Sequence, residues 1–126
     1  KNGFPSDIAT LFLGLCATVS LMTSHGLEQL TWEELLSRPP LDSRTVLLSV
    51  CIPFKKDQSS TLLFETYRSS LRPHGNALAY VTAAFQADVS LSKNSILINE
   101  IQLAFGSYGT KHATRAKKVE EYLTGK

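Results

Sequence analysis

Two long runs of alternating apolar residues constrain the fold more than any other feature of the sequence. They cover Ala79–Leu91 and Ile96–Phe105 and are separated by the polar, turn-forming residues 92–95. Alternation with a period of two is typical of β-strands, and a short polar turn between two such runs favours antiparallel pairing. The sequence therefore predicts a β-hairpin, with a bulge between Ile98 and Ile101 where the alternation shifts by one residue.

Further strands are predicted earlier in the chain. The alternation from Leu15 to Met22 indicates a half-buried strand, and Leu62–Tyr67 indicates a short one. The nearly continuous apolar run Thr45–Ile52 predicts a strand that is covered on both faces. The polar stretch 55–61 is the expected joint between two subdomains.

Three helical segments complete the predicted secondary structure. Ser6 is a suitable N-cap for a helix over about Asp7–Leu13, with Gly14 as its stop. The Thr31 to Glu34 spacing is that of a capping box and opens a second helix, which the following prolines end.

The third helical segment is Lys111–Leu123, where Ala116, Val119 and Leu123 recur at helical spacing and are expected to pack on the hairpin. The chain is thus predicted to be α+β.

Composition excludes several classes of protein. A chain of 126 residues with 43% hydrophobic residues can bury one modest core. Its 13 Lys and Arg are nearly balanced by 11 Asp and Glu, so phosphate-based nucleic-acid binding is not expected. The longest apolar run, Ile8–Val19, is too short for a membrane span. Because the chain opens without Met, we expect a fragment of a longer protein.

The cysteines and histidines give no sign of a metal or catalytic site. Cys16 and Cys51 lie in apolar, strand-like runs and are expected to be buried free thiols in a reducing compartment, hence a cytoplasmic protein. His25, His74 and His112 are too far apart in sequence to indicate a zinc helix or a catalytic triad. We therefore assign no catalytic and no metal-binding residue.

Two charged residues admit a functional interpretation beside a structural one. Asp7 stands at a predicted helix start, where capping is favoured over a ligand contact. Arg68 directly follows a predicted strand, where a solvated charge is favoured over a cofactor contact. The pattern alone leaves the function open.

Several stretches in the same order resemble the plant aldehyde oxidases, members of the xanthine dehydrogenase and aldehyde oxidase family of molybdenum hydroxylases. The resemblance covers nearly the whole chain. The stretches are Phe-Pro-Ser-Asp-Ile-Ala-Thr at 4–10, Leu-Leu-Ser-Val-Cys-Ile-Pro at 47–53, Phe-Glu-Thr-Tyr-Arg at 64–68, Arg-Pro-His-Gly-Asn-Ala-Leu at 72–78, and the run at 102–113.

This resemblance implies a place within the FAD module of such an enzyme. Residues 1–56 would be the end of a PCMH-type FAD-binding domain, and residues 57–126 part of a domain like the CO dehydrogenase flavoprotein C-terminal domain. In the family, electrons from aldehyde oxidation pass from molybdopterin through 2Fe-2S clusters to FAD and then to oxygen. The implied partners are FAD and the remaining domains of a homodimeric parent enzyme, with no membrane or nucleic acid.

Three FAD contacts follow from the resemblance, position by position. Asp7 matches the aspartate of the Ser-Asp element, Leu47 a leucine on the Ile-Pro strand, and Arg68 a position that is commonly lysine. Arg keeps the positive charge of Lys but changes the donor geometry. The glycine-rich loops that bind the FAD pyrophosphate in the family do not occur in this sequence, so we expect the isolated chain to bind FAD weakly or not at all.

The loop at 69–76 departs from the dehydrogenases, which carry acidic residues there. It contains Arg72 and His74 and no acid, which leads to the hypothesis that oxygen is preferred over NAD as electron acceptor. Two alternatives stay open: a non-catalytic α+β interaction module with an exposed apolar patch, and the same segment of a xanthine dehydrogenase.

Overall fold

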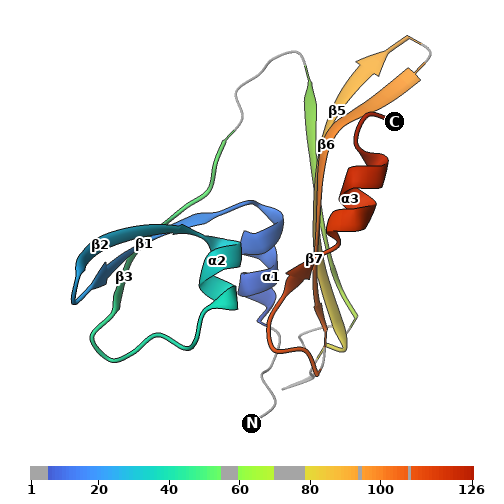
Figure 1. Cartoon of the computed structure of the whole chain (residues 1–126). Coiled ribbons are helices and arrows are strands. Elements are labelled where there is room, and N and C mark those ends of the chain that lie inside the picture. The colour runs from blue at the N-terminus through green and yellow to red at the C-terminus, as the bar shows by residue number, and fades with distance from the viewer. Residues whose placement is uncertain (1–5, 55–59, 70–78, 94, 108) are drawn as a thin grey trace.

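The computed structural model describes residues 6–54, 60–69, 79–93, 95–107 and 109–126. Within these ranges the chain forms two antiparallel sheets and three helices, which confirms the α+β class (Figure 1). The four-stranded sheet has the order β4-β5-β6-β7 and consists of β4 (Thr61–Arg68), β5 (Val81–Ser92), β6 (Ser95–Ser107) and β7 (Thr114–Arg115). The three-stranded sheet has the order β2-β1-β3 and consists of β2 (Gly26–Thr31), β1 (Thr18–Thr23) and β3 (Val46–Cys51).

The predicted hairpin is confirmed as the β5–β6 pair. Its register runs from Val81 opposite Ser107 to Ser92 opposite Ser95. The pairing shifts between Asp88, opposite Glu100, and Val89, opposite Ile98, so that Asn99 is the extra residue of the predicted bulge.

Helix α1 (Asp7–Gly14) packs on the hairpin from one side, and α3 (Lys117–Leu123) lies on the other side of the sheet (Figure 1). The Ser6 side chain accepts a hydrogen bond from the Ala9 amide at 3.2 Å, as its predicted role as N-cap requires. The apolar core between α1 and the four-stranded sheet consists of Leu13, Ala84, Ala104 and Ala113, with Trp32 and Leu36 packed against it.

Helix α2 (Trp32–Ser37) begins with the predicted capping box. The Glu34 amide donates to the Thr31 hydroxyl at 3.2 Å, and the Thr31 amide donates to the Glu34 carboxylate at 2.8 Å. The indole of Trp32 donates to the Ala9 carbonyl at 3.0 Å and meets the Phe12 ring edge-on at 4.8 Å. This side chain therefore connects α2 to α1.

The first sheet differs from the prediction in two ways. Strand β1 begins at Thr18 and not at Leu15, because Cys16 adopts a left-handed backbone conformation with φ of 53° after α1 ends. Strand β2 was not predicted; it pairs with β1 along its whole length, although its sequence lacks regular apolar alternation. Pairing with β1, and not its own sequence pattern, therefore makes this segment a strand.

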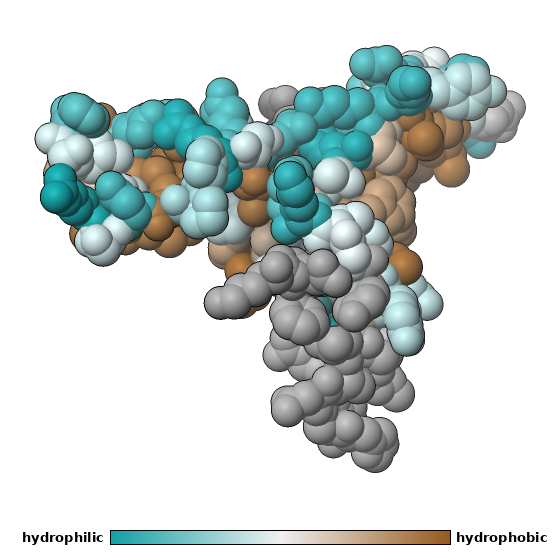
Figure 2. Space-filling model, turned by 60° about the horizontal axis from the view of Figure 1, so that its bottom comes forward, coloured by the Kyte–Doolittle hydropathy of each residue, from teal (hydrophilic) through white to brown (hydrophobic). Residues whose placement is uncertain are grey.

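The prediction that Thr45–Ile52 is covered on both faces is wrong. Strand β3 pairs with β1 as an edge strand, and Val46, Leu47 and Leu48 are about half exposed. Figure 2 shows apolar residues at the surface of the part of the molecule that contains the three-stranded sheet. An apolar run reports a preference for burial, whereas the burial itself depends on a neighbour that covers the strand.

The prediction that both cysteines are buried is also wrong. Cys16 is half-buried in the turn after α1, and Cys51 is exposed at the end of β3. Neither forms a disulfide, as expected.

The last helix is shorter than predicted and presents a different residue to the core. β7 occupies part of the predicted helix, and α3 begins only at Lys117. Val119 is 48% exposed, while Glu120 is 5% exposed. The helix does pack on β6. None of the helices formed by the described residues is long and apolar enough to cross a membrane.

Candidate functional site

A pocket of about 580 Å³ lies between the N-terminal half of α1 and the strands β4 and β5. Its lining consists of Asp7, Ile8, Thr10 and Leu11 from α1, Thr66, Tyr67 and Arg68 from β4, and Thr82, Ala83 and Ala84 from β5. The wall is largely apolar, and a few polar groups are gathered in it, which is the usual composition of a small-molecule site.

Asp7 and Arg68 meet at this pocket. The Arg68 Nε donates to the Asp7 Oδ2 at 3.1 Å, and the side chains are 25% and 29% exposed, respectively. The interpretation of Arg68 as a solvated charge is therefore wrong, because β4 brings it against the first turn of α1. A carboxylate and a guanidinium at the edge of an apolar pocket can form directional hydrogen bonds with a polar ligand edge.

Leu47 lies elsewhere. It is on β3 of the other sheet, opposite Leu21 of β1, and it is 48% exposed. It is not among the residues that line the pocket of Asp7 and Arg68. Of the three residues singled out in the sequence, the structure thus brings two together.

Among the pocket residues that were not singled out in the sequence, two threonines form a buried polar contact. Thr10 and Thr82 are 1% and 4% exposed, and their hydroxyl oxygens lie 3.2 Å apart. A threonine within an apolar helix face, as at Thr10 between Ala9 and Leu13, is a weak signal for a buried polar contact. The partner at Thr82 could not be identified without the fold.

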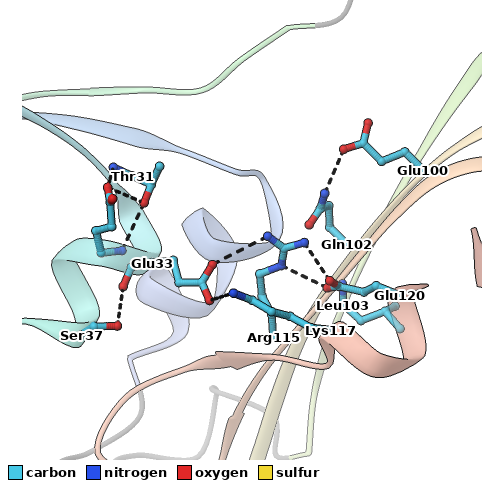
Figure 3. A network of polar contacts seen from close by, with 10 residues as sticks. Thr31, Glu33, Ser37, Glu100, Gln102, Leu103, Arg115, Lys117 and Glu120 are labelled. Atoms are coloured by element: carbon cyan, nitrogen blue, oxygen red, sulfur yellow. Dashed lines mark hydrogen bonds and ion pairs between the residues drawn. The ribbon is translucent and has the colours of Figure 1, made fainter. Parts of the chain in front are cut away.

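A second polar cluster joins α2 to the end of the chain (Figure 3). The Glu120 carboxylate accepts hydrogen bonds from the Leu103 amide at 2.7 Å and from Arg115 Nη2 at 2.7 Å. Glu33 of α2 lies 3.8 Å from Arg115 and 2.7 Å from Lys117. Burial lowers the pKa of the Arg115 guanidinium, but the hydrogen bond and charge of Glu120, together with the charges of Cys16 and Glu33, raise this pKa overall. This cluster connects α2 to the four-stranded sheet and to α3.

The remaining candidates are dispersed. His25 is exposed in the β1–β2 turn, and the His112 Nδ1 lies 2.7 Å from the Ala113 carbonyl oxygen. His74, Arg72 and most of the loop 69–76 fall outside the described residues. Among the residues that are described, no three His, Cys, Asp or Glu side chains are placed to bind one metal ion.

The chain is similar to one family of flavoprotein domains and to several aldehyde oxidases. Residues 65–126 match the family described as CO dehydrogenase flavoprotein C-terminal domain. The whole chain is 56% identical over 134 residues to an indole-3-acetaldehyde oxidase of Arabidopsis thaliana and covers 10% of that protein. It is 53% identical over 133 residues to the probable aldehyde oxidase 4 of Oryza sativa subsp. japonica and covers 16% of that protein. The chain thus spans a small part of the curated relatives that it matches.

Solved structures share the fold at lower sequence identity. The chain is 21% identical to quinoline 2-oxidoreductase from Pseudomonas putida 86, with a TM-score of 0.64 over 96% of this chain and 39% of the other. It is 18% identical to carbon monoxide dehydrogenase from Hydrogenophaga pseudoflava, with a TM-score of 0.68 over 95% of this chain and 42% of the other. The chain therefore belongs to the aldehyde oxidase family, and its residues 65–126 belong to the CO dehydrogenase flavoprotein C-terminal domain.

Proposed function

We propose that this chain forms one wall of the FAD site of an aldehyde oxidase, an enzyme that oxidises aldehydes to carboxylic acids with oxygen as electron acceptor. The single observation that carries the proposal is the contact between Asp7 and Arg68 at the edge of one pocket. The flavoprotein family match and the curated aldehyde oxidases support it.

The pocket fits part of FAD. Its volume of about 580 Å³ lies within the range of about 300–1,000 Å³ that is common for small-molecule sites. The apolar side chains of Ile8, Leu11 and Ala83 suit the face of a flat ring, and Asp7 and Arg68 suit its polar edge. Among the described residues that line the pocket, Arg68 is the only cation, and it lies beside this polar edge.

Each residue would contribute a different interaction. Asp7 would accept a hydrogen bond from the cofactor, and Arg68 would place positive charge beside it. Leu47 would contact the flavin from outside this pocket, since its exposed side chain on β3 is accessible. When bound, FAD would receive electrons from the molybdopterin centre through 2Fe-2S clusters located in other parts of the parent enzyme.

The parent enzyme has further expected properties. Residues 1–56 would belong to the PCMH-type FAD-binding domain and residues 57–126 to the CO dehydrogenase flavoprotein C-terminal-like domain. We further infer a cytoplasmic homodimer. Because curated relatives from Arabidopsis thaliana and Zea mays are named indole-3-acetaldehyde oxidases, indole-3-acetaldehyde is the first substrate to assay, and a role in plant hormone biosynthesis follows from it.

The alternatives lack comparable support. A non-catalytic interaction module would bind its partner through the exposed apolar strand β3. That strand also contains Leu47, so a role in the flavin site accounts for its exposed side chains without a second function. The curated relatives at 48% to 56% identity are named aldehyde oxidases or an aldehyde oxidase-like protein, which disfavours a xanthine dehydrogenase.

A chimeric enzyme tests the proposal. The matched stretch of the Arabidopsis thaliana indole-3-acetaldehyde oxidase is replaced by this chain, and bound FAD is measured from the visible absorbance of the purified protein. We expect the chimera to bind FAD and to oxidise indole-3-acetaldehyde with consumption of oxygen. A folded chimera that contains molybdenum but no FAD would refute the proposal.

Matched variants assign the effect to the pocket. Asp7→Asn and Arg68→Gln should each weaken FAD binding about 10-fold or more, because a hydrogen bond to a charged group contributes about 1.5–3 kcal/mol. The control is Arg38→Gln. It removes an exposed ion pair outside the pocket, in which Arg38 Nη2 lies 2.7 Å from Glu28 Oε1. Equal losses in the control and the pocket variants would refute the assignment.

Two further measurements concern the electron acceptor of the chimera and the ability of the isolated chain to bind FAD. Oxygen consumption with no steady NAD reduction is expected from the chimera, as the basic residues Arg72 and His74 predict. The isolated chain should quench flavin fluorescence only weakly, and a micromolar or tighter dissociation constant would contradict this expectation.

A further inference from the structure

The pocket of Asp7 and Arg68 rests on a buried pair of hydroxyl groups. Besides their mutual contact of 3.2 Å, Thr10 Oγ1 donates to the Ser6 carbonyl at 3.1 Å, and Thr82 Oγ1 lies 3.4 Å from the Gly106 carbonyl. The two hydroxyls supply two protons for three contacts, so one contact must be given up at any moment. The shorter distances favour the direction in which Thr82 donates to Thr10 and Thr10 donates to Ser6.

These contacts join the two backbone segments that carry the pocket's charges. Ser6 is the N-cap of α1 and directly precedes Asp7. Thr82 is the cross-strand partner of Arg68 in the β4–β5 register. The path from Thr82 through Thr10 to Ser6 therefore ties the turn of Asp7 to the neighbour of Arg68.

The ion pair by itself is poorly suited to fix this geometry. The Asp7 and Arg68 side chains are both about a quarter exposed, and partly solvated ion pairs are screened and contribute little. The Thr10 and Thr82 hydroxyls are almost completely buried, and a buried hydrogen bond is expensive to break because its partners cannot turn to water.

We propose that Thr10 and Thr82 are positioning residues for the flavin site: their hydroxyl pair sets the separation of Asp7 and Arg68 and thereby the affinity for FAD. This inference rests on the proposed function. Neither threonine is required to contact the cofactor, because both act through the residues that they hold in place.

Valine substitutions in the chimeric enzyme test it, because valine has the shape of threonine without the hydroxyl. Thr10→Val should raise the FAD dissociation constant about 10-fold, and Thr82→Val several-fold, since only the former also loses the hydroxyl bond to the Ser6 carbonyl. Thr10→Ser keeps the hydroxyl and should restore binding. The control is Thr124→Val, which removes the same kind of hydroxyl bond, from Thr124 to the Glu120 carbonyl; neither residue is among the described residues that line the pocket.

The double variant Thr10→Val/Thr82→Val separates positioning from mere stability. Removing both hydroxyls leaves no unpaired group, so its melting temperature should recover towards that of the unsubstituted chimera. Its affinity for FAD should stay low, because the Thr10–Thr82 contact that joins α1 to β5 is still missing. Recovery of affinity together with melting temperature would overturn the proposal, as would single variants with unchanged affinity.

A readout without cofactor distinguishes this inference from the proposed function. In the nitrogen-labelled full chain, the Arg68 Nε–H signal should be protected from solvent exchange by Asp7, should lose protection in Thr10→Val, and should keep it in Thr124→Val. That result supports positioning even if the chimera binds no FAD, an outcome that would refute the proposed function alone. Unchanged protection in Thr10→Val overturns the positioning role.

Discussion

Gly14 of α1 lies against Ala84 of β5 with no room for a side chain between them. A Cβ atom on Gly14 would fall 2.7 Å from the Ala84 Cβ and 2.9 Å from the Ala84 carbonyl oxygen. Ala84 also lines the pocket, so this contact sets how closely α1 approaches a strand that forms the pocket wall. The absence of a side chain at Gly14 is thus a requirement of packing.

Replacing Gly14 by alanine should therefore destabilise the chain. Alanine usually stabilises a helix interior over glycine by about 1 kcal/mol, but overpacking costs about 1–3 kcal/mol, and here the clash includes backbone. Urea unfolding followed by fluorescence of Trp32, the only tryptophan in the sequence, measures the change. Gly14→Ala/Ala84→Gly should recover only part of the loss, because the carbonyl clash remains. A higher unfolding midpoint for Gly14→Ala would contradict this account.

Glu120→Gln should lower the free energy of unfolding by about 2 kcal/mol. The substitution removes the counter-charge of Arg115, whose side chain is only 22% exposed, and breaking a buried ion pair is costly. The matched control is Glu33→Gln, since Glu33 pairs with Lys117 and lies near Arg115 but is 37% exposed. It should cost less than about 1 kcal/mol. Similar losses in the two variants, measured by urea unfolding, would show that burial does not decide the difference.

Acid should weaken the capping box of α2. Hydrogen bonds from the backbone and then the side chain of Thr31 lower the pKa of Glu34 below its ordinary value of 4.5. Because the pKa is lower in the folded chain, this contribution is present above pH 4.5 and is lost as the pH falls through the folded pKa. NMR titration of the Glu34 carboxyl group measures the shift, and Glu34→Gln should remove this part of the pH dependence. A pKa at or above 4.5 would refute the capping box as its cause.

Ser6→Ala should cost about 1 kcal/mol of stability, because the Ala9 amide loses its capping acceptor. Ser37→Ala is a suitable control, since the Ser37 hydroxyl donates to the Glu33 carbonyl on an exposed helix face and caps no amide. Its loss should stay within about 0.5 kcal/mol. Thermal unfolding of both variants makes the comparison, and equal losses would argue against Ser6 as the N-cap.

Local features of the fold were predictable because short-range chemistry fixes them. Apolar alternation is enough to define the β5–β6 hairpin and its bulge, and the Thr31 and Glu34 spacing is enough to start α2. Strand β2 and the two-residue strand β7 escaped prediction because their pairing with β1 and β6, and not their own sequence, makes them strands. Glu120 escaped it because charged residues are expected at the surface unless a partner such as Arg115 is known.

The candidate site shows the same division. Sequence alone marks Asp7 and Arg68 as charges at the ends of elements, and the resemblance to aldehyde oxidases connects them to FAD. Their contact, across 61 positions, and that of Thr10 with Thr82, across 72 positions, exist only because α1 packs on β5 beside β4. The sequence by itself determined the hairpin, the helix caps and the class of fold, since these depend on neighbours within a few residues. Only the tertiary structure decided which polar groups are buried together, because burial and pairing depend on segments that the chain brings together from far apart.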